Sequence, residues 1–373
     1  MTRLAVVFFT TLILLAIGLM VVMSASNTFS MIFYKDPFYL FNKQFVFVGL
    51  GVILMIAFTI IPYQYYKRIS IYLLILGILL LALTLFVEKD IKGAKRTLDL
   101  IIFSFQPIEF VKLALFIHLC AMIEKMGDRI KSFENGIVYI LFWLGGIVLI
   151  LLFQPNFSSI VMLVVLTFIL MFLGGARMKH LAYMILFFFI TAGSIGYLFL
   201  RHVEQRLDAY ISMLMGTGKI HPQIAQAVIA LGTGNWQGVG FGGSRQKNLF
   251  LSEAHSDFIF AVLGEETGLL GTMLVLILYM VVFVFGLIIA KNAKDQFGRL
   301  LGTMISLTVI FYTLTNVAVT TGLLPPTGFA LPFMSHGGSS ILMSCISIGI
   351  LLNIGFYAHK QNAIPVMPEE VNE

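Results

Sequence analysis

The sequence predicts an all-α polytopic membrane protein with about ten transmembrane helices. Hydrophobic residues make up 59% of the 373 residues, charged residues make up 11%, and the mean hydropathy is +0.97. A chain with so few polar side chains cannot cover the surface of a soluble globule. Its apolar stretches are continuous and of helical length, unlike the short alternating segments of an outer-membrane barrel. A helical bundle satisfies the backbone hydrogen bonds of such segments inside a bilayer.

Ten apolar segments are long enough to be the expected spans. Only Arg3 precedes the first, which is longer than the apolar region of a secretory signal, so we expect an uncleaved anchor. Cys120 and Cys345 fall inside expected helices and do not predict a disulfide between outer loops. The expected spans lie near residues 5–24, 43–61, 68–87, 107–125, 136–152, 156–174, 180–200, 257–290, 299–323 and 334–357.

The chain shows no internal repeat and no linker long enough to separate domains. We therefore predict one membrane domain over residues 1–360, with a long extracytoplasmic loop at 201–256 and a polar cytoplasmic tail at 361–373. Within the long loop, residues 202–215 and 221–232 carry apolar side chains at helical intervals, which predicts amphipathic helices at the membrane interface. The loop then becomes rich in glycine, which is typical of a segment that approaches other groups closely.

The basic residues set an orientation and raise a question about the outer face. With the N-terminus in the cytoplasm, every inner loop is short and basic, as the positive-inside rule expects. Eleven of the 24 Lys and Arg residues nevertheless lie on the outer side, and Lys92, Lys95 and Arg96 crowd one short loop. Such a cluster suits the phosphate of an anionic substrate at the outer surface. Contact with anionic lipid headgroups explains it equally well.

Residues 252–268, SEAHSDFIFAVLGEETG, are the most informative for chemistry, because a polar loop becomes an apolar helix there. Asp257 lies at that junction, and Glu265 and Glu266 lie roughly 12 to 14 Å further along at ~1.5 Å per residue. Carboxylates at that depth are costly unless they have a partner or a task. By helical periodicity Glu266 points away from Asp257, so we expect it to pair with another helix.

Two interpretations of Asp257 remain open. Either Ser256 or Asp257 is the N-cap of the span, or Asp257 is a general base whose pKa is tuned by the bilayer edge and by nearby lysines and arginines. Asp257, Ala261, Gly264 and Gly268 share one face of a regular helix, where small residues predict close helix packing or an open groove.

The fourth expected span also holds charged residues. Glu109 and Lys112 lie three residues apart on one helix face, so they can pair and lower the cost of burial. Pro107 fits the first turn of that helix, and His118 is expected to pack in the core. The last outer loop, GLLPPTGFALPFMSHGGSS, combines prolines and glycines that predict irregular backbone lining an outer cavity.

Several long motifs resemble those of the SEDS family (shape, elongation, division and sporulation), the FtsW and RodA group of bacterial cell-wall polymerases. The resemblance covers nearly the whole chain, and SRQK at 244–247 and EAH before Ser256 look more like the FtsW branch than the RodA branch. The matching motifs are KGAKR at 92–96, FSFQPIEFVKLA at 103–114, QPNFSS at 154–159, GTGNWQGVGFGGSRQK at 232–247, SEAHSDFIFAVLGEETG at 252–268 and PPTGFALPFMSHGGSS at 325–340.

The resemblance implies a multi-pass protein of the bacterial cytoplasmic (inner) membrane. Members of the SEDS family polymerise lipid II, the undecaprenyl-pyrophosphate-linked disaccharide-pentapeptide, into glycan strands at the outer face of that membrane. For this chain the resemblance implies a role in cell division. The family's essential aspartate matches Asp257, the expected catalytic base. The candidate substrate-binding residues are Lys92, Lys95, Arg96, Arg206, Arg245, Lys247, His255 and Ser339. The expected structural or coupling residues are Glu109, Lys112, Glu265 and Glu266.

The resemblance also implies partners and shows departures. A class B penicillin-binding protein, which is a single-span transpeptidase, is the expected partner, together with other divisome membrane proteins and membrane lipids, and no nucleic acid. A divalent metal such as Mg or Mn is a candidate cofactor without a predicted ligand set. Thr97 stands where family members commonly carry tryptophan, Ile108 where serine is common, and His336 where tyrosine is usual. The Thr97 departure weakens the expectation that its loop contacts substrate.

Two functions of other classes remain open. A flippase would move lipid II across the bilayer and would need polar groups along the path, which the four expected coupling residues could supply. A non-catalytic divisome scaffold would keep its function without Asp257. The concentration of acidic and basic residues on one side of the membrane favours the enzyme.

Overall fold

Each of the ten expected spans forms one helix in the computed structural model, which confirms the predicted fold class. The structure describes residues 2–86, 96–99, 104–199, 208, 210–212, 215, 221–248 and 250–362. The membrane helices are α1 (Thr2–Tyr34), α2 (Tyr39–Ile60), α3 (Tyr63–Leu83), α4 (Pro107–Met126), α5 (Val138–Phe153), α6 (Phe157–Leu173), α7 (Met178–Phe199), α10 (Ile259–Lys291), α11 (Gln296–Thr320) and α12 (Gly338–Asn362).

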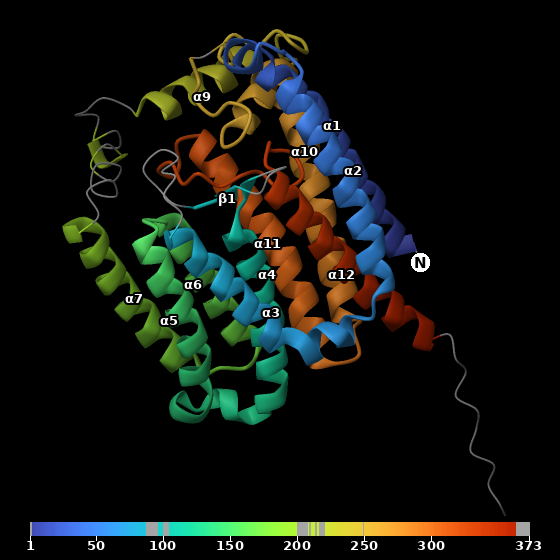
Figure 1. Cartoon of the computed structure of the whole chain (residues 1–373), viewed down its shortest axis with the longest axis vertical. Helices are drawn as coiled ribbons and strands as arrows, with labels where there is room; N and C mark the ends of the chain where they lie inside the picture. Colours follow the sequence, from blue (N-terminus) through green and yellow to red (C-terminus); the bar gives the residue numbers. More distant parts are fainter. Residues whose placement is uncertain are drawn as a thin grey trace, which may run out of the picture.

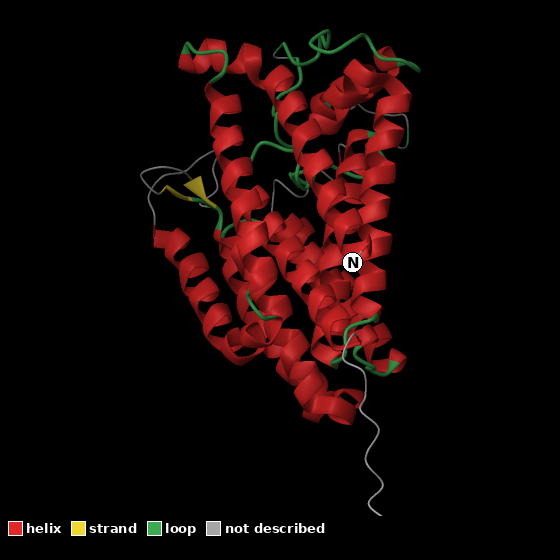
Figure 2. Cartoon of the chain, turned by 90° about the vertical axis from the view of Figure 1, so that its right-hand side faces the viewer, coloured by secondary structure: helices red, strands yellow, loops and turns green. Residues whose placement is uncertain are grey.

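The helices form one bundle (Figures 1 and 2). Helix α2 packs against α12, α10 against α11 and α1, and α3 against α4. Seven of the described helices are long and apolar enough to cross a membrane by length and composition alone. Large apolar side chains such as Ile53, Leu79, Phe142, Phe187 and Ile277 are exposed on the bundle surface, as lipid contact requires. The chain is a multi-pass membrane protein.

Short elements connect the long helices. A 3₁₀ turn, η1 (Thr84–Phe86), follows α3, and the antiparallel pair β1 (Leu98–Asp99) and β2 (Ser104–Phe105) precedes α4. A 3₁₀ segment, η2 (Gly127–Lys131), and a π-helical turn, η3 (Phe133–Ile137), join α4 to α5.

The long loop contributes α9 (Pro222–Gly234) at the end of the bundle where α10 begins (Figure 1). We call this the outer end, following the predicted orientation. Helix α9 confirms the helix expected at 221–232. Most of 202–215, the other expected amphipathic helix, lies outside the described residues, as does nearly all of the tail at 361–373.

Two of the helix boundaries that differ from the expected ones do so for a common reason. Helix α1 continues about ten residues past its apolar run, because Ser24 bonds to Glu266 on α10 and Thr28 bonds to Asn248 of the outer loop. Helix α12 starts at Gly338 and not near residue 334, because the preceding residues bond across to other segments (described below). Tertiary hydrogen bonds therefore move both boundaries away from the hydropathy pattern.

Helix α10 is broken at Gly268, whose φ of 68° and ψ of −165° lie outside the helical region. In a continuous helix the N–H groups of Leu269 and Leu270 would donate to the carbonyls of Glu265 and Glu266. These N–H groups donate instead to Asn235 O (2.9 Å) and Trp236 O (3.2 Å). The two freed carbonyls accept from the N–H groups of Val239 (2.9 Å) and Gly240 (3.1 Å). Residues 235–240, hereafter the splint, thus replace two helical hydrogen bonds with four.

Glycines make this close approach possible. Gly238 has a φ of +78°, and a Cβ there would lie 2.1 Å from the carbonyl oxygen of Glu266. A Cβ on Gly268 would lie 2.4 Å from the backbone nitrogen of Gly238, and one on Gly234 would lie 2.0 Å from Gly264 O. The break also means that Gly268 does not continue a regular helical face from Asp257, contrary to the sequence prediction.

We predict that Gly238→Ala destabilises the protein, because the added methyl group meets the Glu266 carbonyl in a backbone conformation that costs roughly 1–3 kcal/mol for a non-glycine residue. Thermal unfolding of the purified chain in detergent measures the loss. Gly232→Ala in α9 is the matched control, because nothing lies within 4 Å of its added Cβ and alanine favours a helix. Equal melting temperatures for the two variants would contradict the role of the splint.

Candidate active site

Asp257 lies just before α10, at the outer end of the bundle. The N-cap position of α10 is Phe258, whose side chain makes no capping hydrogen bond. Neither Ser256 nor Asp257 therefore occupies the position that one interpretation of Asp257 gave them. Ser256 donates instead to the carboxylate of Glu253 (3.0 Å). Asp257 is partly buried, so it remains accessible while part of its hydration is removed.

The backbone around Asp257 is held by the segment that ends α11 and leads to α12. The His336 N–H donates to His255 O (2.9 Å), Ser335 Oγ donates to Ser256 O (2.6 Å), and Asn316 Nδ2 donates to Asp257 O (2.8 Å). Three successive carbonyls that lie outside the helix thus receive partners from one neighbouring segment. This arrangement fixes the chain at the point where the aspartate projects.

The last outer loop also approaches the Asp257 side chain. Gly328 has a φ of +75°, and a Cβ added there would lie 3.5 Å from Asp257 Oδ2. The loop is anchored from α2, because Gln44 Nε2 donates to Ser335 O (3.1 Å) and Gln44 Oε1 accepts from the Gly337 N–H (3.4 Å). The proline- and glycine-rich loop therefore lies beside the aspartate, as expected from its irregular backbone.

Two histidines pack together next to this backbone clamp. His255 is buried and not solvated, and its ring lies 5.7 Å from the ring of His336 and 4.9 Å from that of Phe29. Burial lowers the pKa of His336 to about 4, with smaller contributions from the positive charges of His255 and Lys43. His336 is therefore neutral at pH 7.

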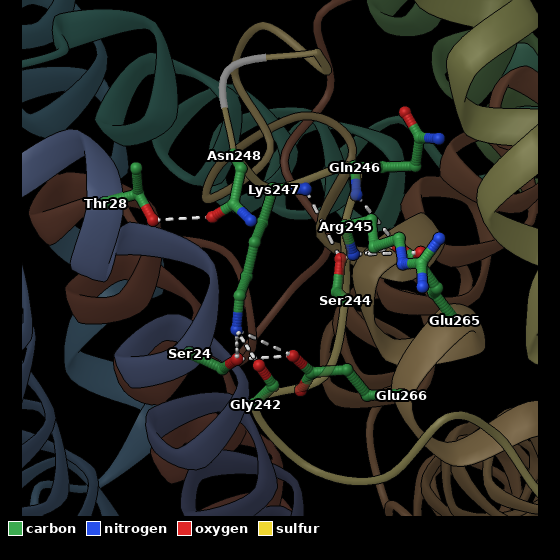
Figure 3. Close-up of polar contacts among 10 residues, drawn as sticks. All are labelled: Ser24, Thr28, Gly242, Ser244, Arg245, Gln246, Lys247, Asn248, Glu265 and Glu266. Carbon is green, nitrogen blue, oxygen red and sulfur yellow. Dashed lines mark hydrogen bonds and ion pairs between the residues drawn. The ribbon is translucent and has the colours of Figure 1, made fainter.

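Lys247 is held inside the protein by Glu266 (Figure 3). Its Nζ donates to Ser24 Oγ on α1 (2.7 Å), to Gly242 O (2.7 Å) and to Glu266 Oε1 (3.2 Å). The Lys247 side chain is 9% exposed and that of Glu266 is 1% exposed. Ser24 also donates to Glu266. Lys247 thus neutralises a buried carboxylate and joins α1, the loop and α10.

Glu265 binds the neighbouring turn of the same loop (Figure 3). Its carboxylate accepts from Ser244 Oγ (2.5 Å) and from the N–H groups of Arg245 (3.0 Å) and Gln246 (3.3 Å). Hydrogen bonds of this kind compensate the burial of a charged carboxylate. The backbone of Arg245, a candidate substrate-binding residue, is thereby fixed at the outer end.

The remaining candidate substrate-binding residues lie in different places. Arg96 Nη2 donates to Pro155 O at the corner between α5 and α6 (2.7 Å). Ser339 is buried at the start of α12, where its Oγ accepts from the Gln106 N–H (3.0 Å) and donates to Ser104 O (3.3 Å). It joins α12 to the entry of α4. The other candidates, Lys92, Lys95 and Arg206, lie outside the described residues.

The expected pair on α4 is present. Lys112 Nζ donates to Glu109 Oε2 (2.6 Å) and to the hydroxyl of Tyr312 on α11 (3.1 Å), and it lies 4.2 Å from the Tyr312 ring centroid. With Pro332 and Ser340, Lys112 and Tyr312 line a cavity between α4, α11 and α12. Ile108, the departure beside this pair, is buried in the apolar core.

Within the described residues, no group of three or more His, Cys, Asp and Glu side chains is arranged to hold a metal ion. A divalent metal such as Mg or Mn stays a prediction from the sequence.

Sequence reasoning missed several polar residues that build the site. Asn316, Ser335 and Gln44 hold the aspartate and its loop, and Ser24 and Ser244 bind the two glutamates. Asn316 and Ser24 gave a usable signal, because each is a polar side chain within an apolar helix. Ser335 and Gln44 gave none, because polar residues are ordinary in a loop and near the end of a helix.

The His336 pKa predicts acid sensitivity. Because the folded-state pKa of about 4 lies below the usual value of ~6.5, the unfolded chain binds more protons between these values. The contribution of neutral His336 to the free energy of unfolding is complete above about pH 6.5 and is lost as the pH falls toward 4. Melting temperatures at pH 7 and at pH 4.5 test this, and the melting temperature of His336→Asn should fall less on acidification than that of the wild type. Equal falls in the two proteins would contradict the lowered pKa of His336.

The buried Lys247–Glu266 pair predicts unequal effects of single and double substitutions. Glu266→Gln or Lys247→Met alone leaves one charge buried without its partner, which typically costs about 3–5 kcal/mol. The double variant should recover part of this loss. Thermal unfolding measures all three, with Lys131→Met as control, because the Lys131–Asp128 pair is exposed and such pairs contribute little. A single variant as stable as this control would contradict the pairing.

The chain matches one protein family over nearly its whole length. Residues 4–360 match the model of the FtsW, RodA and SpoVE family, described as cell cycle protein. The probable peptidoglycan glycosyltransferase FtsW of Trichlorobacter lovleyi is 33% identical over 350 residues, which covers 91% of this chain and 90% of the relative. Stage V sporulation protein E of Bacillus subtilis is 34% identical and covers 93% of this chain and 95% of the relative.

Solved structures share the fold. A structure reported as "Structural coordination of polymerization and crosslinking by a peptidoglycan synthase complex" superposes with a TM-score of 0.77 at 21% identity, covering 95% of this chain and 98% of that chain. The rod shape determining protein RodA of Thermus thermophilus superposes with a TM-score of 0.67 at 24% identity, covering 94% and 95% of the two chains. The family match over nearly the whole chain decides its identity: this protein belongs to the FtsW, RodA and SpoVE family of cell cycle proteins.

Proposed function

We propose that this protein is a peptidoglycan glycosyltransferase that polymerises lipid II into glycan strands during cell division. Its most similar relatives include several proteins named probable peptidoglycan glycosyltransferase FtsW. We further propose that the protein lies in the bacterial cytoplasmic membrane and that its active site faces outward. Helix α9 lies at the end of the bundle where α10 begins (Figure 1), and Asp257 comes just before α10, which supports a single reaction site there.

The observation that carries the proposal is the placement of Asp257. It is partly buried at the outer end, it is not the N-cap of α10, and its backbone is fixed by bonds from α11 and the last outer loop. A general base needs this combination of access, altered solvation and fixed position.

The acceptor hydroxyl is a poor nucleophile until it loses its proton. In the proposed step the Asp257 carboxylate takes the proton from the 4-hydroxyl of the acceptor sugar. That oxygen attacks the anomeric carbon of the donor, and the bond from this carbon to the pyrophosphate oxygen breaks. Undecaprenyl pyrophosphate leaves with the electron pair. A positioned base contributes a rate factor of about 10²–10⁴ to such a step.

The leaving pyrophosphate needs cationic partners. Arg96 and the outer basic residues at 92, 95 and 206 remain the proposed source, together with Arg245, whose backbone Glu265 fixes. Lys247 is less suited, because its ammonium group already neutralises Glu266. The proposed step uses no metal ion. Adding a chelator to the polymerisation assay tests whether the reaction needs one.

The arrangement of the buried charges favours an enzyme over a flippase. Glu109 bonds to Lys112, Glu265 to residues 244–246, and Glu266 to Lys247. Side chains held in this way act as structural links, whereas a translocation path needs polar groups that can exchange partners with the substrate.

We also propose a partner, a class B penicillin-binding protein with transpeptidase activity. The superposition on a chain from a complex described as coordinating polymerization and crosslinking supports this proposal at the level of fold. Other divisome membrane proteins are proposed neighbours on the basis of the division-type relatives.

The test is polymerisation of labelled lipid II by the full chain purified with its transpeptidase partner. Asp257→Asn should lower the rate at least ~10²-fold, because the amide cannot accept the proton, while thermal stability and lipid II binding remain close to wild type. Asp128→Asn is the control, an exposed carboxylate in η2, between α4 and α5. Glycan strands formed at the wild-type rate by Asp257→Asn would exclude the catalytic assignment. Flipping without polymerisation by the wild type would support the flippase.

A further inference from the structure

Asn316 joins the backbone of Asp257 to the last outer loop, which approaches the Asp257 carboxylate. It lies within α11, 2% exposed, and its Nδ2 donates to Asp257 O and to Phe329 O, both at 2.8 Å. Asp257 precedes α10, whereas Phe329 belongs to the last outer loop. One amide group thus spans a gap between segments that are 72 residues apart in the sequence.

The chemistry of these partners fixes how the Asn316 amide is turned. Both partners are carbonyl oxygens, which only accept hydrogen bonds, so the NH₂ group and not the oxygen must face them. Both of its protons are used, one for each segment. Few other buried side chains can make this link, because a hydroxyl group has a single proton and a carboxylate has none.

The link determines the surroundings of the carboxylate. Gly328, next to Phe329, lies close enough that a Cβ there would contact Asp257 Oδ2 at 3.5 Å. The backbone of Gly328 therefore forms one wall beside the carboxylate. Because Asn316 holds Asp257 and Phe329 together, it sets the distance between the carboxylate and this wall.

We propose that Asn316 is a positioning residue for Asp257, which keeps the carboxylate at the distance and angle required for proton transfer. This inference rests on the proposed function, because it matters for chemistry only where Asp257 is the base. Ser335 and the N–H of His336 hold the two preceding carbonyls from the same segment. Asn316 is the member of this set that bonds to Asp257 itself.

Loss of Asn316 should affect the chemical step more than binding. A displacement of about 1 Å in a reacting group can lower the rate by up to ~10²-fold. For Asn316→Ala we expect kcat to fall between about tenfold and a hundredfold, with KM for lipid II within about twofold of wild type. Asn316→Asp has nearly the same shape but presents carboxylate oxygens to two carbonyl oxygens, so its kcat should fall at least as far.

The control is Thr313→Val on the same helix. Thr313 is fully buried, and its hydroxyl donates only within α11, to Val309 O (2.9 Å). The substitution removes a buried hydrogen bond near Asn316 without touching Asp257 or the loop. Its kcat should stay within about twofold of wild type, and its melting temperature reports how much stability such a bond contributes.

The experiment measures kcat, KM and melting temperature for the full chain with its transpeptidase partner, with lipid II as substrate. A second arm places Asn316→Ala in an Asp257→Glu background, where the carboxylate is already displaced. A positioning role predicts that the second substitution then costs less than it does in the wild type. Equal costs in the two backgrounds, or a wild-type kcat for Asn316→Ala, would overturn the inference.

The outcomes separate this inference from the function on which it rests. Polymerisation at the wild-type rate by Asp257→Asn would exclude Asp257 as the general base, whatever the effect of the Asn316 substitutions. Loss of activity in Asp257→Asn with unchanged kcat in Asn316→Ala leaves the base in place and refutes only the positioning role. A fall in kcat no larger than that of Thr313→Val, at a similar loss of melting temperature, identifies Asn316 as structural only.

Discussion

The break in α10 at Gly268 is the constraint on which the outer half of the structure depends. A helix interrupted at membrane depth must find partners for its freed backbone groups, and the splint supplies four hydrogen bonds where two are missing. Gly238 and Gly268 cannot carry side chains there, because each would collide with the backbone of the other segment. The first turns of α10, and Asp257 before them, are thereby tied to the outer loop as well as to the bundle.

The same two residues that lose helical partners also hold the loop through their side chains. Glu265 binds the turn at 244–246, and Glu266 binds Lys247 and Ser24. One basic residue of the outer face is therefore structural and not a phosphate ligand. This placement accounts for part of the unusual positive charge of the outer face. Among the basic residues that the structure describes, Arg96 and Arg245 remain candidates for contact with an anionic substrate. These contacts join the loop to α1 and to the helix that follows Asp257.

Hydropathy predicted all ten spans, because apolar runs of helical length have few alternatives in a bilayer. It could not predict the break at Gly268 or the late start of α12, which depend on hydrogen bonds between segments far apart in the sequence. At the site, Asp257 was found from its position at a polar-to-apolar junction and from the family resemblance. Asn316 was missed, although an amide in an apolar helix was visible, because its partners are backbone carbonyls that leave no pattern in the sequence. The small-residue face from Asp257 to Gly268 failed as a regular face because periodicity assumes a continuous helix.

The central claim is that a clamped backbone presents the Asp257 carboxylate to the acceptor sugar. The most direct measurement is a cryo-electron microscopy structure of Asp257→Asn bound to lipid II and to the transpeptidase partner. The account predicts the acceptor 4-hydroxyl about 2.6–3.2 Å from the side chain of residue 257, with the bonds from Asn316 and Ser335 still in place. An acceptor hydroxyl placed instead on the Glu109–Lys112 pair, or out of reach of residue 257 in a complete substrate complex, would contradict it.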